Sequence, residues 1–286
     1  MVFSPPIQWY PGHIAKAERQ LKAQLKNVDV VLEVIDARLP LASQHPQVPD
    51  WIGQKPRVLV VNRVDMIPKD LQAAWREWFL AQDETPCFTD AKQGKGVNAV
   101  RKAAQAAGEA MNQRRRDRGL RPRPVRAVVL GFPNVGKSAL INRLVSRNVV
   151  ASARRAGVTR QLRWVRISDS IELLDAPGVI PARLDNQDDA VKLAICEDIG
   201  EAAYDNQRVA AVLVDLIVSL EFGQVLQHRY ALNPETITGE EFIQNLAELR
   251  YRGDKERVAC LLLNDFRKGN LGAIPLELPP VSSPTG

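Results

Sequence analysis

The eight residues GFPNVGKS at 131–138 restrict the fold of this chain more than any other segment. Their two glycines, lysine and serine have the spacing of a phosphate-binding loop, which lies between a β-strand and the helix that follows it. Both neighbours are predicted, because the apolar run VRAVVLG at 125–131 precedes the loop and a pattern of helical period covers 136–146. The segment therefore predicts an α/β domain that binds a nucleotide phosphate.

The residues of this loop have expected roles in binding phosphate and metal. Gly131 and Gly136 let backbone amides approach phosphate oxygens, and Ser138 ligates Mg²⁺. Lys137 neutralises the β and γ phosphates, which makes it a candidate catalytic residue. The residues predicted to contact the nucleotide here are Asn134, Val135, Gly136, Lys137, Ser138 and Ala139.

Strand-like and helical segments alternate in the first two-thirds of the chain. Apolar runs bounded by turn signals lie at 28–36, 57–62, 87–90, 125–131, 162–167 and 171–175. Helical patterns lie between several of them, at 70–82, 96–112 and 136–146. This alternation predicts a mostly parallel sheet with helices on both faces.

The C-terminal third has a different pattern. After Asn186 no strand is predicted, and four segments show apolar residues at helical spacing: 191–205, 208–220, 240–252 and 255–268. We therefore expect an N-terminal segment with a helix at 1–27, the nucleotide-binding domain at 28–185, an all-helical domain at 186–274 and a proline-rich, disordered tail at 275–286.

An arginine-rich stretch, RRRDRGLRPRPVR at 114–126, interrupts the nucleotide-binding domain. It mixes arginine with proline and glycine, so we expect it to end the preceding helix and to form a linker at about 113–125. Such a linker is either a solvated connector or a contact for a phosphate backbone.

A second motif, IELLDAPG at 171–178, supplies a strand that ends in Asp175 and is followed by Gly178. An acidic residue at the end of a strand beside the phosphate loop can hold the Mg²⁺ shell, and the glycine amide can contact the γ-phosphate. By itself the pattern also fits a surface turn, but its position after the phosphate loop favours the nucleotide role. Thr159, between the two motifs, is then expected to reach Mg²⁺ only in the triphosphate state.

The stretch VVNRVD at 60–65 has features of a guanine-binding loop. Asp65 can accept both N1–H and the exocyclic amine of guanine, a pair that adenine lacks. Asn62 would tie the loop together, and Arg63 and Val64 would lie against the base. Taken alone, Asn62 and Asp65 also fit an Asx turn after a strand.

A second candidate base loop, TDAK at 89–92, follows one helix and one strand later. In it Asp90 and Ala91 are expected to contact the nucleotide, with the Ala91 amide meeting the guanine carbonyl. Both base loops precede the phosphate loop, whereas the usual guanine-nucleotide domain has the phosphate loop first. The sequence therefore predicts a circular permutation, which can fold because the ends of such domains lie near each other.

The motifs NRVD, TDAK, GFPNVGKS, GVT and DAPG in this order, with WYPGHIAKA at 9–17 and DARLP at 36–40, resemble the circularly permuted ribosome-assembly GTPases. The resemblance is greatest to the ribosome biogenesis GTPase A family and covers residues 8 to about 200. It implies hydrolysis of GTP to GDP with Mg²⁺, coupled to maturation of the large ribosomal subunit, and a C-terminal helical domain that touches RNA. Arg63 departs from the lysine that is commoner at this position.

The catalytic group is less evident, because the residue after Gly178 is Val179, which cannot orient a water molecule as glutamine does in many GTPases. Asn134 matches the family residue that helps to seat K⁺, and a loop-stabilising hydrogen bond is the alternative. His13, at the start of a helix expected at 13–27, is the second candidate, and its alternative is a helix cap.

Charge and composition limit the partners. The net charge is +6, with +10 in residues 1–199 and −4 in residues 200–286. This excess of positive charge permits a polyanionic partner, such as the large subunit or its precursor. The helical domain alone is not basic. No apolar run is long enough to cross a bilayer and no secretory signal is recognisable, so we expect a cytoplasmic protein. We also expect it to be a monomer. The cysteines Cys87, Cys196 and Cys260 lack metal or disulfide spacing.

Two other functions fit parts of the sequence. The chain would be an RNA- or ribosome-binding scaffold if GTP were mainly a structural ligand, which the missing glutamine allows. It would be an ATPase or a nucleotide kinase if NRVD were a chance match.

Overall fold

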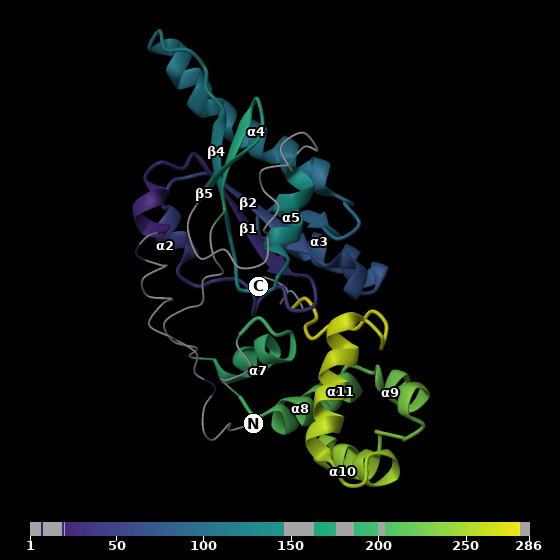
Figure 1. Ribbon diagram of the computed structural model, residues 1–286. Helices are drawn as coiled ribbons and strands as arrows, with labels where there is room; N and C mark the ends of the chain where they lie inside the picture. Colours follow the sequence, from purple (N-terminus) through teal and green to yellow (C-terminus); the bar gives the residue numbers. More distant parts are fainter. Residues whose placement is uncertain are drawn as a thin grey trace.

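The computed structural model describes Ile7, Arg19 and residues 21–145, 163–175, 186–199 and 204–280. Within these residues the chain forms one six-stranded sheet with the order β3-β2-β1-β4-β6-β5 (Figure 1). The strands are β1 Val30–Asp36, β2 Arg57–Asn62, β3 Cys87–Thr89, β4 Val125–Leu130, β5 Arg163–Ser168 and β6 Ile171–Asp175. All neighbouring pairs are parallel except β5 and β6. The predicted mostly parallel sheet is confirmed.

The central strands carry apolar residues on both sides, and helices cover both faces of the sheet. On one face Val31 and Ile35 of β1 pack with α2 (Val48–Ile52) and α3 (Lys69–Ala81), and with the helical residues 21–25. On the other face Val30, Leu32 and Val34 pack with α4 (Val97–Asp117) and α5 (Lys137–Leu144). The short α2 has no counterpart in the sequence-based expectations.

Helix α4 is longer than the sequence pattern predicted. We expected the helix at 96–112 to end before the arginines, but it continues through Arg114, Arg115 and Arg116 to Asp117. Arginine is a good helix former, and cations are stabilising in the last turn, where the helix dipole is negative. The helix-breaking Gly119 and Pro122 come only afterwards, so the connecting segment is shorter than the predicted linker.

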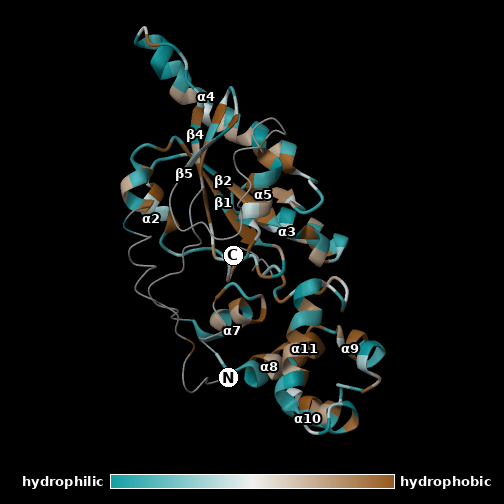
Figure 2. Ribbon diagram, in the orientation of Figure 1, coloured by the Kyte–Doolittle hydropathy of each residue, from teal (hydrophilic) through white to brown (hydrophobic). Residues whose placement is uncertain are grey.

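All regular elements among the described residues of the C-terminal part are helices. Its helices are α7 Gln187–Ile195, α8 Asn206–Ser219, α9 Gly223–Tyr230, α10 Gly239–Arg250 and α11 Lys255–Lys268. The apolar α8 lies at the centre, against α10 and α11 (Figure 2). Helix α9 was not predicted, and α7 begins before the predicted segment and ends at Ile195. The buried apolar residues of these helices form one continuous cluster with the α4 face of the sheet.

The start of the predicted disordered tail is ordered and packs on the sheet domain. The amides of Leu276 and Glu277 both donate to the carbonyl of Arg38, at 2.7 and 3.1 Å. The Glu277 carboxylate accepts the amide of Leu41 at 2.8 Å and the ammonium of Lys192 at 3.0 Å. The prediction of disorder from proline content was therefore wrong for residues 275–280, because buried backbone and carboxylate contacts hold them.

No single helix in the described part of the chain is long and apolar enough to span a membrane. Helices α8 and α9 meet this criterion only together, as a pair bent by 120°.

Candidate nucleotide-binding site

Four parallel strands end side by side at one edge of the sheet. Strands β3, β2, β1 and β4 are neighbours in this order and run in the same direction, so Thr89, Asn62, Asp36 and Leu130 end at that edge. In open α/β sheets ligands bind outside the carboxyl ends of the strands. The loops that follow these strands are the two candidate base loops, the DARLP loop and the phosphate loop.

The phosphate loop has the backbone that anion binding requires. Residues Gly131, Asn134 and Gly136 have positive φ angles of 144°, 57° and 97°, and α5 begins directly after Gly136. The Lys137 ammonium is buried and donates to the carbonyls of Gly131 at 3.2 Å and Phe132 at 2.5 Å. Ser138 is exposed at the helix start. The loop therefore combines a buried lysine with the N-terminus of a helix at the end of β4.

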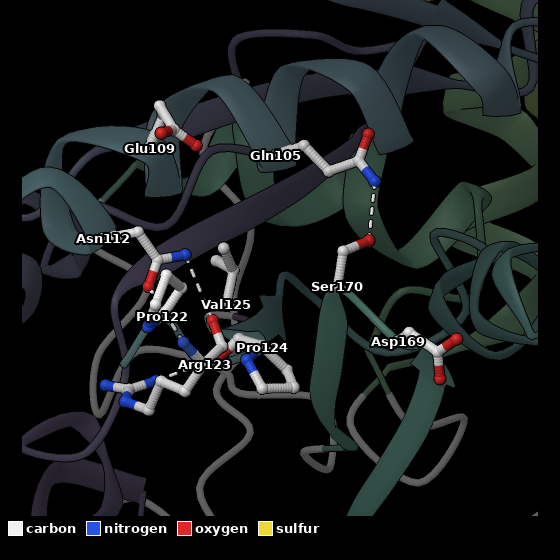
Figure 3. Close-up of a pocket in the computed structure, with 9 residues that line it drawn as sticks. All are labelled: Gln105, Glu109, Asn112, Pro122, Arg123, Pro124, Val125, Asp169 and Ser170. Atoms are coloured by element: carbon white, nitrogen blue, oxygen red, sulfur yellow. Dashed lines mark hydrogen bonds between the residues drawn. The ribbon is translucent and has the colours of Figure 1, made fainter. Parts of the chain in front are cut away.

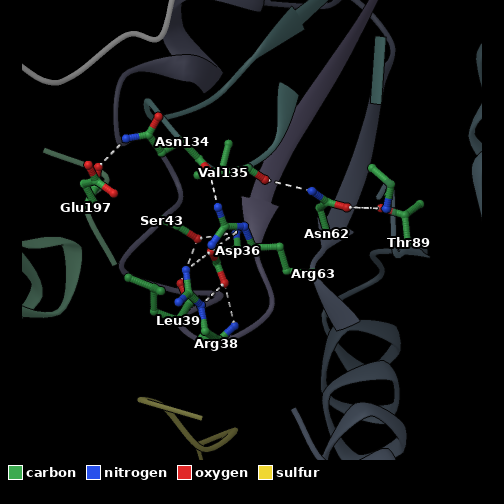
Figure 4. A network of polar contacts seen from close by, with 11 residues as sticks. Asp36, Arg38, Leu39, Ser43, Asn62, Arg63, Thr89, Asn134, Val135 and Glu197 are labelled. Atoms are coloured by element: carbon green, nitrogen blue, oxygen red, sulfur yellow. Dashed lines mark hydrogen bonds and ion pairs between the residues drawn. The ribbon is translucent and has the colours of Figure 1, made fainter. Parts of the chain in front are cut away.

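The side chain of Asn62 joins three loops (Figure 4). Its Nδ2 donates to the carbonyl of Val135 at 2.8 Å, and its Oδ1 accepts from the Thr89 hydroxyl and the Ala91 amide, each at 3.0 Å. A Cβ at Gly136 would lie 2.1 Å from Asn62 Nδ2, so only glycine permits this approach. The NRVD loop, the TDAK loop and the phosphate loop are thereby fixed relative to one another.

The TDAK loop is a tight turn. Asp90 Oδ1 accepts the amide of Gln93 at 2.9 Å, and the Asp90 amide donates to the carbonyl of Lys95 at 3.1 Å. The Ala91 amide, which we expected to face the guanine carbonyl, is used by Asn62 Oδ1. A nucleotide contact at this amide would require a hydrogen bond shared with Asn62 or a small shift of the loop.

Arg63 and Asp65 point to different surroundings. Arg63 has a φ of 63°, and its guanidinium donates to the carbonyl of Asn134 at 2.7 Å, so it contacts the phosphate loop. Val64 and Asp65 begin the short 3₁₀ helix η1, Val64–Met66. The Asp65 carboxylate is exposed and has no hydrogen bond or ion pair with any described residue, which leaves it available to a ligand.

Below these loops lies a buried ion pair. Asp36 accepts two side-chain hydrogen bonds from Arg38, at 3.0 and 2.7 Å, and both side chains are fully buried. Burial opposes ionisation of Asp36, but the charges and hydrogen bonds of Arg38 outweigh it and hold the pKa of this carboxyl below its usual value. The Arg38 guanidinium carbon also lies 5.2 Å from the ring centroid of Phe266 in α11. This contact links the domain that contains the sheet (the sheet domain) to the helices α7–α11 (the helical region).

The segment after α7 contacts the phosphate loop directly. Asn134 Nδ2 donates to the carbonyl of Glu197 at 2.7 Å, across 63 residues of sequence (Figure 4). The next residue, Asp198, is fully buried, and neither of its carboxyl oxygens has a hydrogen-bond partner within the described part of the chain. Burial, and next the charge of Asp36, raises the pKa of Asp198 well above its usual value, while Arg38, Arg63 and Lys137 oppose this shift.

Several predicted site residues lie outside the described part of the chain. They are His13, Thr159 and Gly178. Asp175 ends strand β6, next to β4, but its side chain also lies outside the description.

Comparison with known proteins agrees with this geometry. The family described as 50S ribosome-binding GTPase matches residues 126–248. A ribosome biogenesis GTPase A from Bacillus cereus is 34% identical over 279 residues, which cover 96% of this chain and 94% of that protein. The protein of the same name from Priestia megaterium is 33% identical and covers 96% and 97%. The chain belongs to the ribosome biogenesis GTPase A family.

The fold of the family is also found in solved structures. The GNP-bound structure of YlqF from T. maritima has a TM-score of 0.63 and is 24% identical, covering 92% of this chain and 98% of that one. A GDP-bound YlqF structure has a TM-score of 0.64 and is 24% identical, covering 91% of this chain and 99% of that one. Membership in the ribosome biogenesis GTPase A family confirms the predicted GTPase fold and activity, and the match beginning at residue 126, in the strand before the phosphate loop, accords with the permuted order.

The sequence analysis missed several residues of this region. The DARLP segment was noticed as a motif, but its buried pair between Asp36 and Arg38 was not. Glu197 and Asp198 carried no signal, because they lie in a stretch that reads as an ordinary amphipathic helix. Their position depends on α7 ending at Ile195, which the helical spacing did not indicate.

The raised pKa of Asp198 leads to a prediction about stability. A carboxyl whose pKa is higher in the folded protein contributes stability below its ordinary value of 3.8 and loses it as the pH rises through the folded value. Asp198→Asn cannot ionise, so its free energy of unfolding should exceed that of the wild type increasingly from acid to neutral pH, by up to about 1.4 kcal/mol per pH unit. Urea unfolding between pH 4.5 and 8 measures this difference.

The exposed variant Asp169→Asn is the control, and it should show no such trend. A difference between Asp198→Asn and wild type that does not change with pH would contradict the prediction.

Proposed function

We propose that this protein is a GTP-hydrolysing assembly factor that acts, as a monomer, in maturation of the large ribosomal subunit. The observation that carries the proposal is the buried Asn62 side chain, which holds two base loops and the phosphate loop together in a chain of the ribosome biogenesis GTPase A family. The 50S ribosome-binding description of the matched family supports the choice of the large subunit.

The geometry fits a guanine nucleotide with Mg²⁺. Lys137 and the amides of residues 134–139 would hold the phosphates, because α5 begins there and the loop has the positive φ angles of an anion cradle. Asp65 would accept the guanine N1–H and amine, with Arg63, Val64 and the TDAK residues Asp90 and Ala91 around the base. Mg²⁺ would be held by Ser138, with Thr159 and Asp175, and would neutralise charge on the transferred phosphate.

Hydrolysis requires a group in place of the missing glutamine. Asn134 is our candidate for seating K⁺, since its Nδ2 is held by Glu197 and its Oδ1 has no partner among the described residues. His13 is our candidate for orienting the attacking water. Gly178, whose amide would contact the γ-phosphate, begins the segment that leads into the helical region.

This connection supports a coupling between nucleotide and partner binding. The helical region follows directly after the DAPG motif in sequence, and Glu197 contacts the phosphate loop through Asn134. We propose that a change at these loops on GTP hydrolysis moves the helical region, so that the GTP form docks on the particle and the GDP form leaves.

The second candidate is an RNA- or ribosome-binding scaffold in which GTP is mainly structural. Valine at 179, where glutamine orients water in many GTPases, favours it.

The first experiment separates these two functions. Hydrolysis of GTP is measured in KCl and in NaCl, with and without purified large ribosomal subunits, and with ATP as the control substrate. We expect slow hydrolysis by the protein alone and strong stimulation by subunits in KCl, with GTP only. His13→Ala should lose most of the stimulated rate while still binding GTP. Tight GTP binding without any stimulation would support the scaffold.

The guanine assignment is tested at Asp65. Asp65→Asn removes one acceptor for the guanine N1–H and amine, so we expect GTP to bind at least about tenfold more weakly, as expected when one charge-assisted hydrogen bond is lost. Fluorescent nucleotide titration measures this, with exposed Asp70→Asn as the control. Unchanged preference for GTP over ATP in Asp65→Asn would indicate that NRVD is not the base loop.

The coupling is tested by affinity for the subunit precursor. We expect the protein with a non-hydrolysable GTP analogue to bind the precursor at least about tenfold more tightly than the protein with GDP, which corresponds to a coupling free energy of about 1.4 kcal/mol. Equal affinities in sedimentation or mass photometry would refute the coupling.

A further inference from the structure

Helix α4 extends beyond the sheet on which it packs. Its 21 residues span about 31 Å at 1.5 Å per residue, whereas strands of six or seven residues span about 20–23 Å. The helix crosses β4 at Gly108, where a Cβ would lie 2.2 Å from Val125 Cγ2. Residues 109–124, which we name the arginine arm, form the part of α4 beyond this crossing and the return to β4 (Figure 1).

The arginine arm is held in one conformation by its own hydrogen bonds. Asn112 and the backbone of Arg123 exchange two hydrogen bonds of 3.1 Å, and Arg115 Nε donates to the carbonyl of Arg121 at 3.0 Å. The guanidinium of Arg123 forms a bidentate ion pair with Asp29 at the start of the sheet domain, at 2.7 and 2.9 Å. The arm is therefore a pre-ordered surface, which lowers the entropy cost of binding.

The charge of the arm is strongly positive and partly uncompensated. It contains six arginines and only two acidic residues, Glu109 and Asp117. Arg114, Arg118 and Arg121 are exposed and form no hydrogen bond or ion pair through their side chains with the part of the chain that is described. The ion pair of Arg116 with Glu109 is largely exposed and is easily exchanged for another anion.

A cavity of about 400 Å³ lies between the base of the arm and the turn that joins β5 to β6 (Figure 3). Its polar groups are already bonded within the protein, since Gln105 donates to the Ser170 hydroxyl at 2.7 Å and Asn112 is paired with Arg123. The three free guanidinium groups do not line this cavity. The ligand of the arm is therefore expected on its outer surface.

We propose that the arginine arm binds the phosphate backbone of double-stranded RNA. Arginine matches phosphate oxygens with paired N–H donors, and such contacts are independent of sequence. A protein interface would need an apolar centre, but Leu120 is the only large hydrophobic residue exposed on the arm. No aromatic residue is present in 97–124 on which unpaired bases would stack, so a duplex is favoured over a single strand. The end of α4 beyond the sheet accordingly consists mostly of hydrophilic residues (Figure 2).

The biological source of this RNA rests on the proposed function, in which the arm contacts ribosomal RNA of the maturing large subunit. The distribution of charge supports this surface over the helical region, because residues 1–199 carry +10 and residues 200–286 carry −4. The arm leaves the sheet at the edge opposite the nucleotide loops, since α4 begins beside the TDAK loop and runs back along the strands. Neutralising its arginines should therefore leave nucleotide binding unchanged.

The test uses the full chain with a non-hydrolysable GTP analogue and a labelled 20-base-pair RNA duplex. In the arm variant Arg114, Arg118 and Arg121 are all replaced by glutamine, which preserves helix propensity. We expect at least about tenfold weaker binding at 0.1 M salt, and a slope of log affinity against log salt that is smaller by about three, one for each lost phosphate contact. In the control variant Lys69, Arg250 and Lys268, which are exposed elsewhere, are replaced by glutamine and binding should be unchanged.

Two results would overturn the proposal: unchanged affinity and salt slope in the arm variant, or equal weakening in the control variant, which would reflect net charge alone. Arm-dependent binding of poly-glutamate as tight as that of the duplex would mean that the surface binds an acidic protein.

With large subunits, the arm variant should need about tenfold more subunits for half-maximal GTPase stimulation and retain its basal rate. Absence of stimulation in the wild type would count against the proposed function, while the duplex measurement would still decide the role of the arm.

Discussion

The nucleotide edge of this protein depends on the buried amide of Asn62. Asn62 lies 73 residues before Val135, whose carbonyl accepts a hydrogen bond from its Nδ2, and helices α3 and α4 lie between them in sequence. Because this side chain satisfies a carbonyl, a hydroxyl and an amide from two other loops, its loss would leave three buried polar groups unpaired, each costing about 1–3 kcal/mol. One well-satisfied polar side chain thus holds together loops that are far apart in sequence. Glycine at 136 is required by the same contact.

A second constraint is the buried ion pair between Asp36 and Arg38, which lies where the sheet domain meets the helical region. Arg38 is buried because Asp36 neutralises it, and its guanidinium and carbonyl contact Phe266 and the amides of Leu276 and Glu277. The chain returns to this point after α11, so the helical region is attached at both of its ends. Asp198 is the one carboxylate of this junction without a partner among the described residues. Such an uncompensated group costs stability, and proteins keep these costs mainly where a site has to respond to a ligand.

Much of the sheet domain was predictable because its signals are local. The strands at 57–62 and 171–175 were predicted with the bounds that the structure has, and the phosphate loop lies where its strand-loop-helix pattern places it. The errors have physical causes. Arginines continued α4 because propensity and the helix dipole favour them, and residues 275–280 are ordered by contacts with residues more than 80 positions away. The link between Asn134 and Glu197 and the use of the Ala91 amide by Asn62 arise only from tertiary packing, which no periodicity encodes.

In the proposed function, the arginine arm and the Glu197 segment would make different contributions to binding of a particle. A contact that is equally strong with GTP and GDP cannot shift the balance between the two forms, however much affinity it supplies. The arginine arm is held by the bonds that Arg123 makes with Asn112 and Asp29, remote from the phosphate loop, so we expect its contribution to be the same in both nucleotide states. The Glu197 segment, in contrast, contacts the phosphate loop itself. If both proposals hold, we expect the nucleotide dependence to arise at the Glu197 segment and the helices that follow it, while the arm sets the overall affinity and its dependence on salt. In the proposed cycle, such a division would allow release on hydrolysis without loss of the electrostatic attraction that brings the protein to the next particle.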